Sequence, residues 1–218
     1  MTSLLLLAAT RWEAVPLASR LGLTRAGTHH WSGRVAGRAV TLRQTAMGAE
    51  RTAAALAGAA PGLLISTGFA GALQSGLRTG ELIAEELFPC PEAAAALRRS
   101  GFPMHFGRLA HSDRVLADPE DKLSLGRSTG ALAVDMESSA VRAWAQARGT
   151  PALALRVILD EAAFAFPRDL PQSEDSLTLA RYAAGHPADW PRLAGLWLRQ
   201  RQASKALAFI LQCLLETL

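Results

Sequence analysis

The sequence predicts an α/β fold, in which a mostly parallel or mixed sheet is covered by helices on both faces. Apolar runs of strand length alternate with helical patterns along the chain, as is typical of such sheets. In addition, the segment "WSGRVAGRAVTL" has the pattern of a hairpin that turns at Ala36-Gly37, which adds antiparallel character. The chain has 218 residues, half of them hydrophobic, so it can bury one substantial core and is expected to form a single domain.

Six apolar runs are the expected strands. They are Leu4–Ala9, Ala39–Thr45, Leu63–Thr67, Leu82–Leu87, Ala131–Met136 and Ala152–Leu159. Helices are expected at Glu50–Ala60, which is rich in alanine, at Pro91–Arg99, which begins with proline, and at Ser138–Arg148, which ends at a glycine. The tail, from about residue 173 to residue 218, is expected to form a helical segment that is interrupted near "GHPADWP".

Composition excludes several classes of protein. The two cysteines, Cys90 and Cys213, are too few for a disulfide framework and have no nearby histidine or cysteine that would suggest a zinc site, so we expect a reduced, cytoplasmic setting without a metal or cofactor. The apolar run at the N-terminus is too short for a signal peptide, and no other run could span a membrane. The net charge is +4, but the 21 arginines and two lysines are scattered, so nucleic-acid binding is not expected.

Two glycine-containing segments follow predicted strands. In open α/β sheets, ligands bind at the carboxyl ends of the strands. "STGFAGAL" begins at Ser66 and "AMGAE" begins at Ala46, and each could bring backbone amides close to an anion or a sugar. The alternative is that each segment is only a tight turn between a strand and a helix.

Asp135 and Glu137 lie two residues apart in "VDMESS", where a buried strand should give way to a helix. Two carboxylates that share one face of a strand repel each other, so at least one of them needs a partner. Two vicinal sugar hydroxyls would be suitable donors for Glu137. Alternatively, Glu137 and Ser138 only cap the helix that follows.

Asp160 comes directly after the strand "LALRVIL", again at a carboxyl end. Burial there should raise the pKa of its carboxyl toward the range in which it can donate a proton near neutral pH, whereas Arg156 would lower that pKa if its side chain reaches the site. The alternative is an N-cap at the start of a helix.

Taken together, three segments resemble the nucleoside phosphorylase and nucleosidase superfamily. "LISTGFAGAL" is similar to its glycine-rich loop, "VDMESSAV" to its ribose-binding motif, and "LRVILDEA" to its catalytic aspartate motif, in the same order and with similar spacing over most of residues 3 to 165. Within the superfamily, "GALAVDMESSAV" and the tail most resemble the hopanoid-associated nucleoside phosphorylase group. The resemblance implies a three-layer αβα sandwich with a central mixed sheet, often as a homo-oligomer.

The resemblance also implies roles for individual residues. Glu137 would bind the ribose hydroxyls, Met136 would pack under the sugar, and Asp160 would protonate the purine, while Asp135 would be structural. Gly68, Phe69 and Ala70 of the glycine-rich segment would complete the substrate site. An additional subsite for phosphate or water is predicted from cationic side chains and free amides near the two glycine turns, with Arg11, Gly48, Arg51 and Thr67 as its candidates.

The implied function is cleavage of the N-glycosidic bond of a purine nucleoside, by a phosphorylase with phosphate as co-substrate or by a nucleosidase with water. Phe69 stands where better-known members have a hydroxyl residue, and Arg11 stands where hydrolytic members have a glutamate, although Glu13 follows two residues later. The segment between Leu87 and Pro91 is shorter than in nucleosidases with a lid, which leaves room for a bulky apolar sugar substituent such as that of an adenosyl-hopanoid. The alternative is a nucleoside-binding or regulatory protein without catalysis.

The C-terminal segment, residues 190–218, is predicted to be helical, basic and amphipathic. Its cations alternate with leucines and aromatic residues, so one face could contact an anionic membrane as a peripheral protein. Packing of this face on its own domain or on a second subunit is the favoured expectation, because amphipathic helices usually bury their apolar side.

Overall fold

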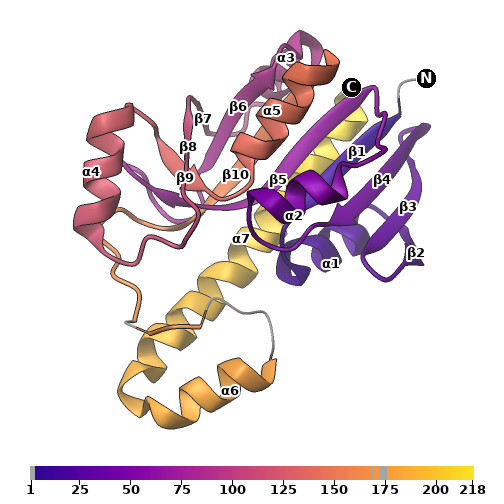
Figure 1. Ribbon diagram of the computed structural model, residues 1–218. Coiled ribbons are helices and arrows are strands. Elements are labelled where there is room, and N and C mark those ends of the chain that lie inside the picture. Colours follow the sequence, from indigo (N-terminus) through magenta and orange to yellow (C-terminus); the bar gives the residue numbers. More distant parts are fainter. Residues whose placement is uncertain (1–2, 168, 172–175) are drawn as a thin grey trace.

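The computed structural model (Figure 1) describes residues 3–167, 169–171 and 176–218. Its centre is one mixed sheet of ten strands. The strands are β1 (Leu4–Ala8), β2 (Thr24–Gly27), β3 (His30–Val35), β4 (Arg38–Gln44), β5 (Leu63–Ala72), β6 (Leu82–Phe88), β7 (Met104–Phe106), β8 (Leu109–His111), β9 (Ala133–Asp135) and β10 (Ala152–Asp160). The helices are α1 (Arg11–Arg20), α2 (Ala49–Ala55), α3 (Pro91–Arg99), α4 (Pro119–Thr129), α5 (Ser138–Arg148), α6 (Ser176–Gly185) and α7 (Trp190–Thr217), with a 3₁₀ turn at Pro187–Asp189.

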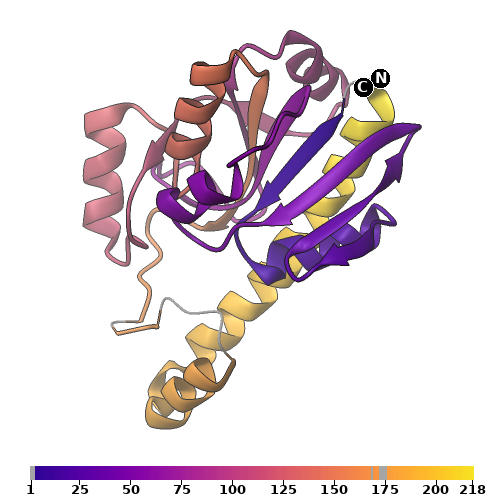
Figure 2. The ribbon, with the colours of Figure 1, turned by 45° about the vertical axis from the view of Figure 1, so that its right-hand side comes forward.

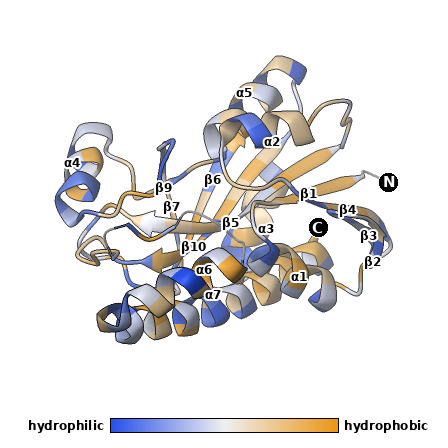
Figure 3. Cartoon of the chain, turned by 60° about the horizontal axis from the view of Figure 1, so that its bottom comes forward, coloured by the Kyte–Doolittle hydropathy of each residue, from blue (hydrophilic) through white to orange (hydrophobic). Residues whose placement is uncertain are grey.

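The predicted three-layer sandwich is confirmed. Helices α1 and α7 lie below the sheet in Figure 3, and α2 and α5 lie above it. The lower core joins leucines of β1 and β4 to α1, α3 and α7, and the upper core joins the alternate side chains of β1, β5 and β10 to α2 and α5. Alternation along one strand shows this directly, because Leu6 belongs to the lower core and Leu7 to the upper one.

The strand order places the carboxyl ends of four parallel strands side by side. The sheet runs β2-β3-β4-β1-β5-β10-β6-β7, with β9 paired to β5 and to β8. Strands β4, β1, β5 and β10 are parallel, and the register puts Ala8 opposite Thr67 and Arg156 opposite Gly68. Side chains at the ends of these strands therefore meet at one edge of the sheet, as the sequence predicts.

One sequence expectation is wrong in an informative way. The glycine-rich segment is not a loop after the strand, because β5 continues through it to Ala72. Its residues pair with β10 on one side, and Gly71 pairs with Val134 of β9 on the other. Glycine here permits close approach by neighbouring side chains, since the backbone is part of the sheet.

The other predicted elements agree closely with the structure. The hairpin turns at Ala36 and Gly37, which have φ of 48° and 79°, the left-handed region that a two-residue hairpin requires. Helix α2 is shorter than expected and ends at Ala55. The sequence analysis did not identify the short strands β2, β7 and β8 or the helices α1 and α4.

Helix α1 contains Pro16, which removes one backbone donor from the helix. The carbonyl that this donor would have reached belongs to Trp12, and it instead accepts a hydrogen bond of 2.8 Å from Ser204 Oγ of α7. Ser204 also bonds to Gln200 O in its own helix. This contact joins the two helices under the sheet at a fixed position.

The C-terminal segment forms a projecting arm. We use this name for α6, the 3₁₀ turn and the N-terminal half of α7, which extend beyond the sheet in Figures 1 and 2. The predicted helical tail is confirmed from residue 176 onward, and its predicted interruption coincides with the 3₁₀ turn. Residues 173–175 of that prediction lie outside the described residues.

Candidate active site

Glu13 enters the site from the start of α1, and the sequence analysis gave it no definite role. Thr10 is the N-cap of this helix, and its amide donates to Glu13 Oε2 at 2.7 Å, which fixes the side chain. The amide of Phe69 in β5 donates to Glu13 Oε1 at 2.8 Å. A side chain at Gly68 would place its Cβ only 2.6 Å from Oε1, so glycine is needed there. Burial raises the pKa of Glu13, while these amides and the charge of Arg156 oppose the rise.

Arg156 is the buried cation next to Glu13, and it is already paired. Its Nε and Nη2 donate to Asp135 Oδ2 at 2.8 and 2.6 Å, and Nη2 also reaches Ser66 Oγ at 2.9 Å. Both side chains of this ion pair are only 1% exposed. Asp135 further accepts hydrogen bonds from the amide and the hydroxyl of Ser138. Asp135 is therefore structural: it neutralises Arg156 and caps α5.

Glu137 is directed into the site and does not cap the helix. It occupies the N-cap position of α5, but its side chain makes no capping hydrogen bond, because Asp135 serves that function. Its Oε1 instead accepts from the amide of Gly48 at 3.0 Å, and its Oε2 lies 4.0 Å from Arg156. Burial and the charge of Asp135 raise the pKa of Glu137 to about 7, although Arg156 opposes the rise. The capping alternative for Glu137 is thus wrong.

Asp160, at the end of β10, is bound to a lysine that the sequence analysis did not single out. Lys122 Nζ of α4 lies 2.5 Å from Asp160 Oδ2 and also donates to the carbonyl oxygens of Phe164 at 2.7 Å and Glu161 at 3.3 Å. Lys122 is 1% exposed, and its ammonium lies 5.1 Å from the ring centroid of Phe166. The chain thus has a second buried ion pair, separate from the one at Arg156.

The surroundings of Asp160 correct two expectations. Burial raises the pKa of Asp160, and the cations that oppose this rise are Lys122 and then Arg199 of α7, not Arg156. No helix begins after Asp160 within residues 161–167, so the N-cap alternative is wrong. A Cβ on Gly71 would lie 3.1 Å from Asp160 Oδ2. Two glycines of β5 therefore face two different acids: Gly68 faces Glu13, and Gly71 faces Asp160.

The other predicted site residues have different positions. Arg11 and Arg51 are exposed, and the guanidinium of Arg11 lies 4.9 Å from the ring centroid of Trp12. Ala70 is buried in the upper core, and Phe69 packs against the lower core while its amide binds Glu13.

Three predicted residues lie beside the acids of the site. Met136 is half-buried between Asp135 and Glu137, and the amide of Gly48 binds Glu137. Thr67 is buried beside Gly68, and its hydroxyl has no hydrogen-bond partner among the described residues, so a ligand could bind it.

Two functional candidates were missed, Glu13 and Lys122, for different reasons. The sequence T-x-x-E from Thr10 to Glu13 is a capping-box pattern. This pattern marks the start of α1 and indicates that the side chain of Glu13 turns back to the N-terminal end of the helix. Lys122 lies 38 residues before Asp160, and no local spacing connects them.

Comparison with known proteins identifies the fold. Residues 84–184 match the Phosphorylase superfamily. The structure is similar to the 5′-methylthioadenosine/S-adenosylhomocysteine nucleosidase of S. pneumoniae, with a TM-score of 0.77 and 18% identity over 99% of both chains. The corresponding Campylobacter jejuni enzyme gives 0.75 and 16% over 100% of both chains. The fold is that of the nucleoside phosphorylase and nucleosidase superfamily.

A second activity is represented among the proteins that share this fold. The futalosine hydrolase of Helicobacter pylori, solved as a mutant, has a TM-score of 0.73 and 17% identity over 100% of both chains. A search of curated proteins by sequence finds no match. At these identities, the likeness to solved structures concerns the fold alone.

Proposed function

We propose that this protein is an enzyme of the nucleoside phosphorylase and nucleosidase superfamily that cleaves the N-glycosidic bond of a purine nucleoside. The observation that carries the proposal is the pair of buried acids, Glu13 and Asp160, opposite Gly68 and Gly71 of one strand. Gly68 and Gly71 are three residues apart, so at about 3.3 Å per residue the two acids approach β5 at points about 10 Å apart along the strand. Glu137 stands beside Glu13, close enough for the charge of one to raise the pKa of the other.

At one end of the site, Asp160 is proposed to protonate the leaving purine. Breaking the bond leaves a positive charge on the sugar and a negative charge on the base, so a proton delivered to the imidazole nitrogen of the base stabilises the transition state. The buried Asp160 carboxyl can carry this proton because burial raises its pKa. The ammonium of Lys122 holds the carboxyl in place and, after proton transfer, neutralises the aspartate that remains.

At the other end, Glu137 is proposed to accept hydrogen bonds from the two ribose hydroxyls. A carboxylate can accept both donors, and its oxygens are directed by the amide of Gly48 and by Arg156. Met136 is proposed to pack against the sugar. The alternative of a binding protein without catalysis was motivated by Phe69 in place of a hydroxyl residue and by Arg11 in place of an acid. Glu13 answers the second of these grounds, because it brings an acid to the site from the same helix.

Water is the proposed nucleophile, with Glu13 as its general base and the hydroxyl of Thr67 as a hydrogen-bond partner. The charge balance supports this choice over phosphate. Glu13, Asp135 and Glu137 share the buried cation Arg156, and Asp135 already neutralises it, so this end of the site has no unpaired buried cation among the described residues to offer a phosphate dianion. Arg11 and Arg51, the candidate phosphate ligands, are exposed. The solved structures with this fold that are described above also carry names of nucleosidases and a hydrolase.

The proposed substrate has a bulky apolar group on its sugar, as in an adenosyl-hopanoid. Only two residues separate β6, which ends at Phe88, from α3, which begins at Pro91, so no long lid can arise at this connection. The enzyme is further proposed to need no cofactor, because an acid and a base suffice for the reaction. It is also proposed to act in the cytoplasm as a homo-oligomer. None of the helices among the described residues is long and apolar enough to cross a membrane.

The decisive experiment is incubation with adenosine, inosine and 5′-alkyl adenosines, with and without phosphate, followed by chromatography of the base and the sugar. We expect free base and free sugar at rates independent of phosphate, and faster turnover of substrates with longer 5′-alkyl groups. A phosphorylated sugar would reject water as the nucleophile. Binding of the nucleosides without any release of base would reject the catalytic function.

A further inference from the structure

Helix α7 has two apolar sides, and only one of them is buried under the sheet; on the other, Phe209 packs edge-on against Phe102. Its C-terminal half buries one side under the sheet, with Leu207, Ile210, Leu211, Leu214 and Leu215 in the lower core. For the C-terminal half of α7, this confirms the expectation that an amphipathic helix packs on its own domain. A second set of large apolar residues remains on the surface.

We call this second set, together with two cations, the outer stripe. It consists of Trp190, Trp197, Leu198, Arg201, Lys205 and Phe209. These residues are spaced by combinations of three and four positions, so they share one side of the helix. The exposed fractions are 57% for Trp190, 49% for Trp197, 54% for Leu198 and 43% for Phe209. Such a group of large exposed apolar side chains marks a contact surface.

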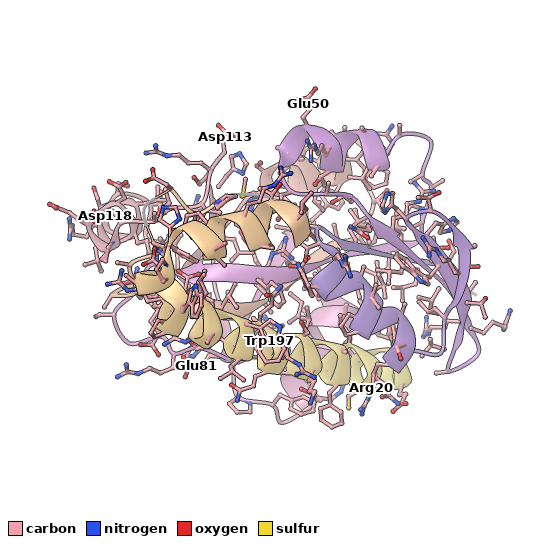
Figure 4. All side chains as sticks on the ribbon, turned by 90° about the horizontal axis from the view of Figure 1, so that it is seen from below. Arg20, Glu50, Glu81, Asp113, Asp118 and Trp197 are labelled. Atoms are coloured by element: carbon pink, nitrogen blue, oxygen red, sulfur yellow. The ribbon has the colours of Figure 1, made fainter. Side chains whose placement is uncertain are left out.

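The position of the outer stripe makes it accessible. Its N-terminal part lies on the arm that projects beyond the sheet in Figure 2. Figure 4 shows Trp197 on α7 and Arg20 of α1, whose Nε donates to Gln212 of α7. Arg199 is two residues from both Trp197 and Arg201, which places it on the opposite side of the helix, where it lies over the ring of Phe164. The outer stripe therefore faces away from the candidate active site.

The charge of the outer stripe indicates which kind of surface it contacts. No acidic residue occurs from 190 to 215, whereas Arg201 and Lys205 lie within the stripe. The guanidinium of Arg201 lies 4.6 Å from the ring centroid of Trp197, and Arg20 of α1 lies 5.1 Å from that of Phe209. A second copy placed on the same side chains would bring these cations together without an acid to compensate them. The complementary surface is anionic and accepts both aromatic and aliphatic side chains.

We propose that the outer stripe docks this protein on the surface of an anionic lipid bilayer. Tryptophan lies favourably at the level of the lipid headgroups, and leucine and phenylalanine can enter the acyl boundary. Arginine and lysine contact the lipid phosphates, and each strengthens binding by about fivefold. The contact is peripheral, along the helix surface. It does not depend on the proposed reaction.

The test is flotation of the full chain with vesicles of phosphatidylglycerol and phosphatidylcholine, at low and at high salt. We expect the protein to float with anionic vesicles and to remain behind with pure phosphatidylcholine. The variant Arg201→Glu/Lys205→Glu should lose at least about 25-fold in binding, and Trp190→Ser/Trp197→Ser should also lose binding. Circular dichroism and thermal melting check that both variants fold.

A matched control separates the outer stripe from the general basicity of the chain. Arg108→Glu/Arg127→Glu makes the same change in net charge at exposed positions on other elements, and it should float like the parent. Equal loss in this control, or no flotation of the parent, would overturn the proposal. So would a dimer in analytical ultracentrifugation that the tryptophan variant dissociates, because a second copy would then cover the stripe.

Discussion

The two ends of the candidate site stabilise their buried charges in different ways. At the Glu13 end, three carboxylates share one arginine, so negative charge is in excess and the pKa of Glu137 rises to about 7. At the Asp160 end, one carboxylate meets one lysine, and two backbone carbonyls complete the lysine's hydrogen bonds. The Glu13 end is suited to accept hydrogen bonds and to bind a proton. The Asp160 end is suited to hold one acid in a fixed place. The following predictions test this difference.

The largest effect is expected at the paired end. Asp160→Asn removes the ionisable proton, so turnover should fall about 10²- to 10⁴-fold with little change in the dissociation constant of a nucleoside. Single-turnover rates and equilibrium binding measure the two quantities. Because Lys122 would lose its counter-charge, the free energy of unfolding should also fall, by about 3–5 kcal/mol.

A double variant distinguishes these two losses. Asp160→Asn/Lys122→Met removes both charges, so its stability should recover relative to the single variant while its turnover remains low. Denaturant unfolding monitored by fluorescence provides the stability. If turnover recovered together with stability, Asp160 would be a structural residue and not the general acid.

The next effect is expected at the acid-rich end. Glu13→Gln keeps the shape of the side chain but removes the base, so hydrolysis should slow about 10²-fold. The amides of Thr10 and Phe69 donate to different oxygens of Glu13, so the glutamine can accept from only one of them, and the free energy of unfolding should fall by about 1–3 kcal/mol. The rate of base release is measured with and without phosphate, so that hydrolysis is distinguished from phosphorolysis. A variant that releases base at the parental rate would exclude Glu13 as the base.

A smaller effect is expected for Glu137→Gln. Hydrogen bonds to a charged group contribute about 1.5–3 kcal/mol each, so the loss of one should weaken binding of a ribonucleoside by about 10- to 100-fold at pH 8. Isothermal titration with a 2′-deoxynucleoside is the control, since it lacks one of the two donors. Equal losses for both ligands would mean that Glu137 does not contact the 2′-hydroxyl.

The smallest effect concerns pH. The raised pKa of Glu137, about 7, means that the free protein binds a proton there at pH 6 and releases it by pH 8. The ribose hydroxyls prefer the ionised form as acceptor, so nucleoside affinity should rise with pH, by about tenfold between pH 6 and pH 8. The Glu137→Gln variant should lack this dependence. An affinity that falls with pH in the parent would contradict the proposed contact.

Much of the fold could be predicted from the sequence, because six buried strands and three helices have strong local patterns. The hairpin at Ala36-Gly37 and the helix Pro91–Arg99 agree with the structure for this reason. The glycine-rich segment was predicted as a loop because glycine weakens a strand pattern. In the structure, its glycines are required by side chains that approach from other elements, Glu13 at Gly68 and Asp160 at Gly71.

The site could be predicted only where its residues lie near a recognisable motif. Glu137 and Asp160 are identified by their places at the ends of strands and by resemblance, and the structure buries both. The pairing of Asp135 with Arg156, and of Asp160 with Lys122, joins residues 21 and 38 positions apart. Such contacts depend on the order of strands and on the placement of α4, which no local pattern specifies.

The burial of Lys122 has a consequence for the evolution of related sequences. A lysine at this depth is tolerated only with a carboxylate and two carbonyl oxygens around it. Positions 122 and 160 should therefore covary among related sequences. Lineages that lose the aspartate should exchange the lysine for an apolar residue, and lineages that keep the lysine should keep the aspartate.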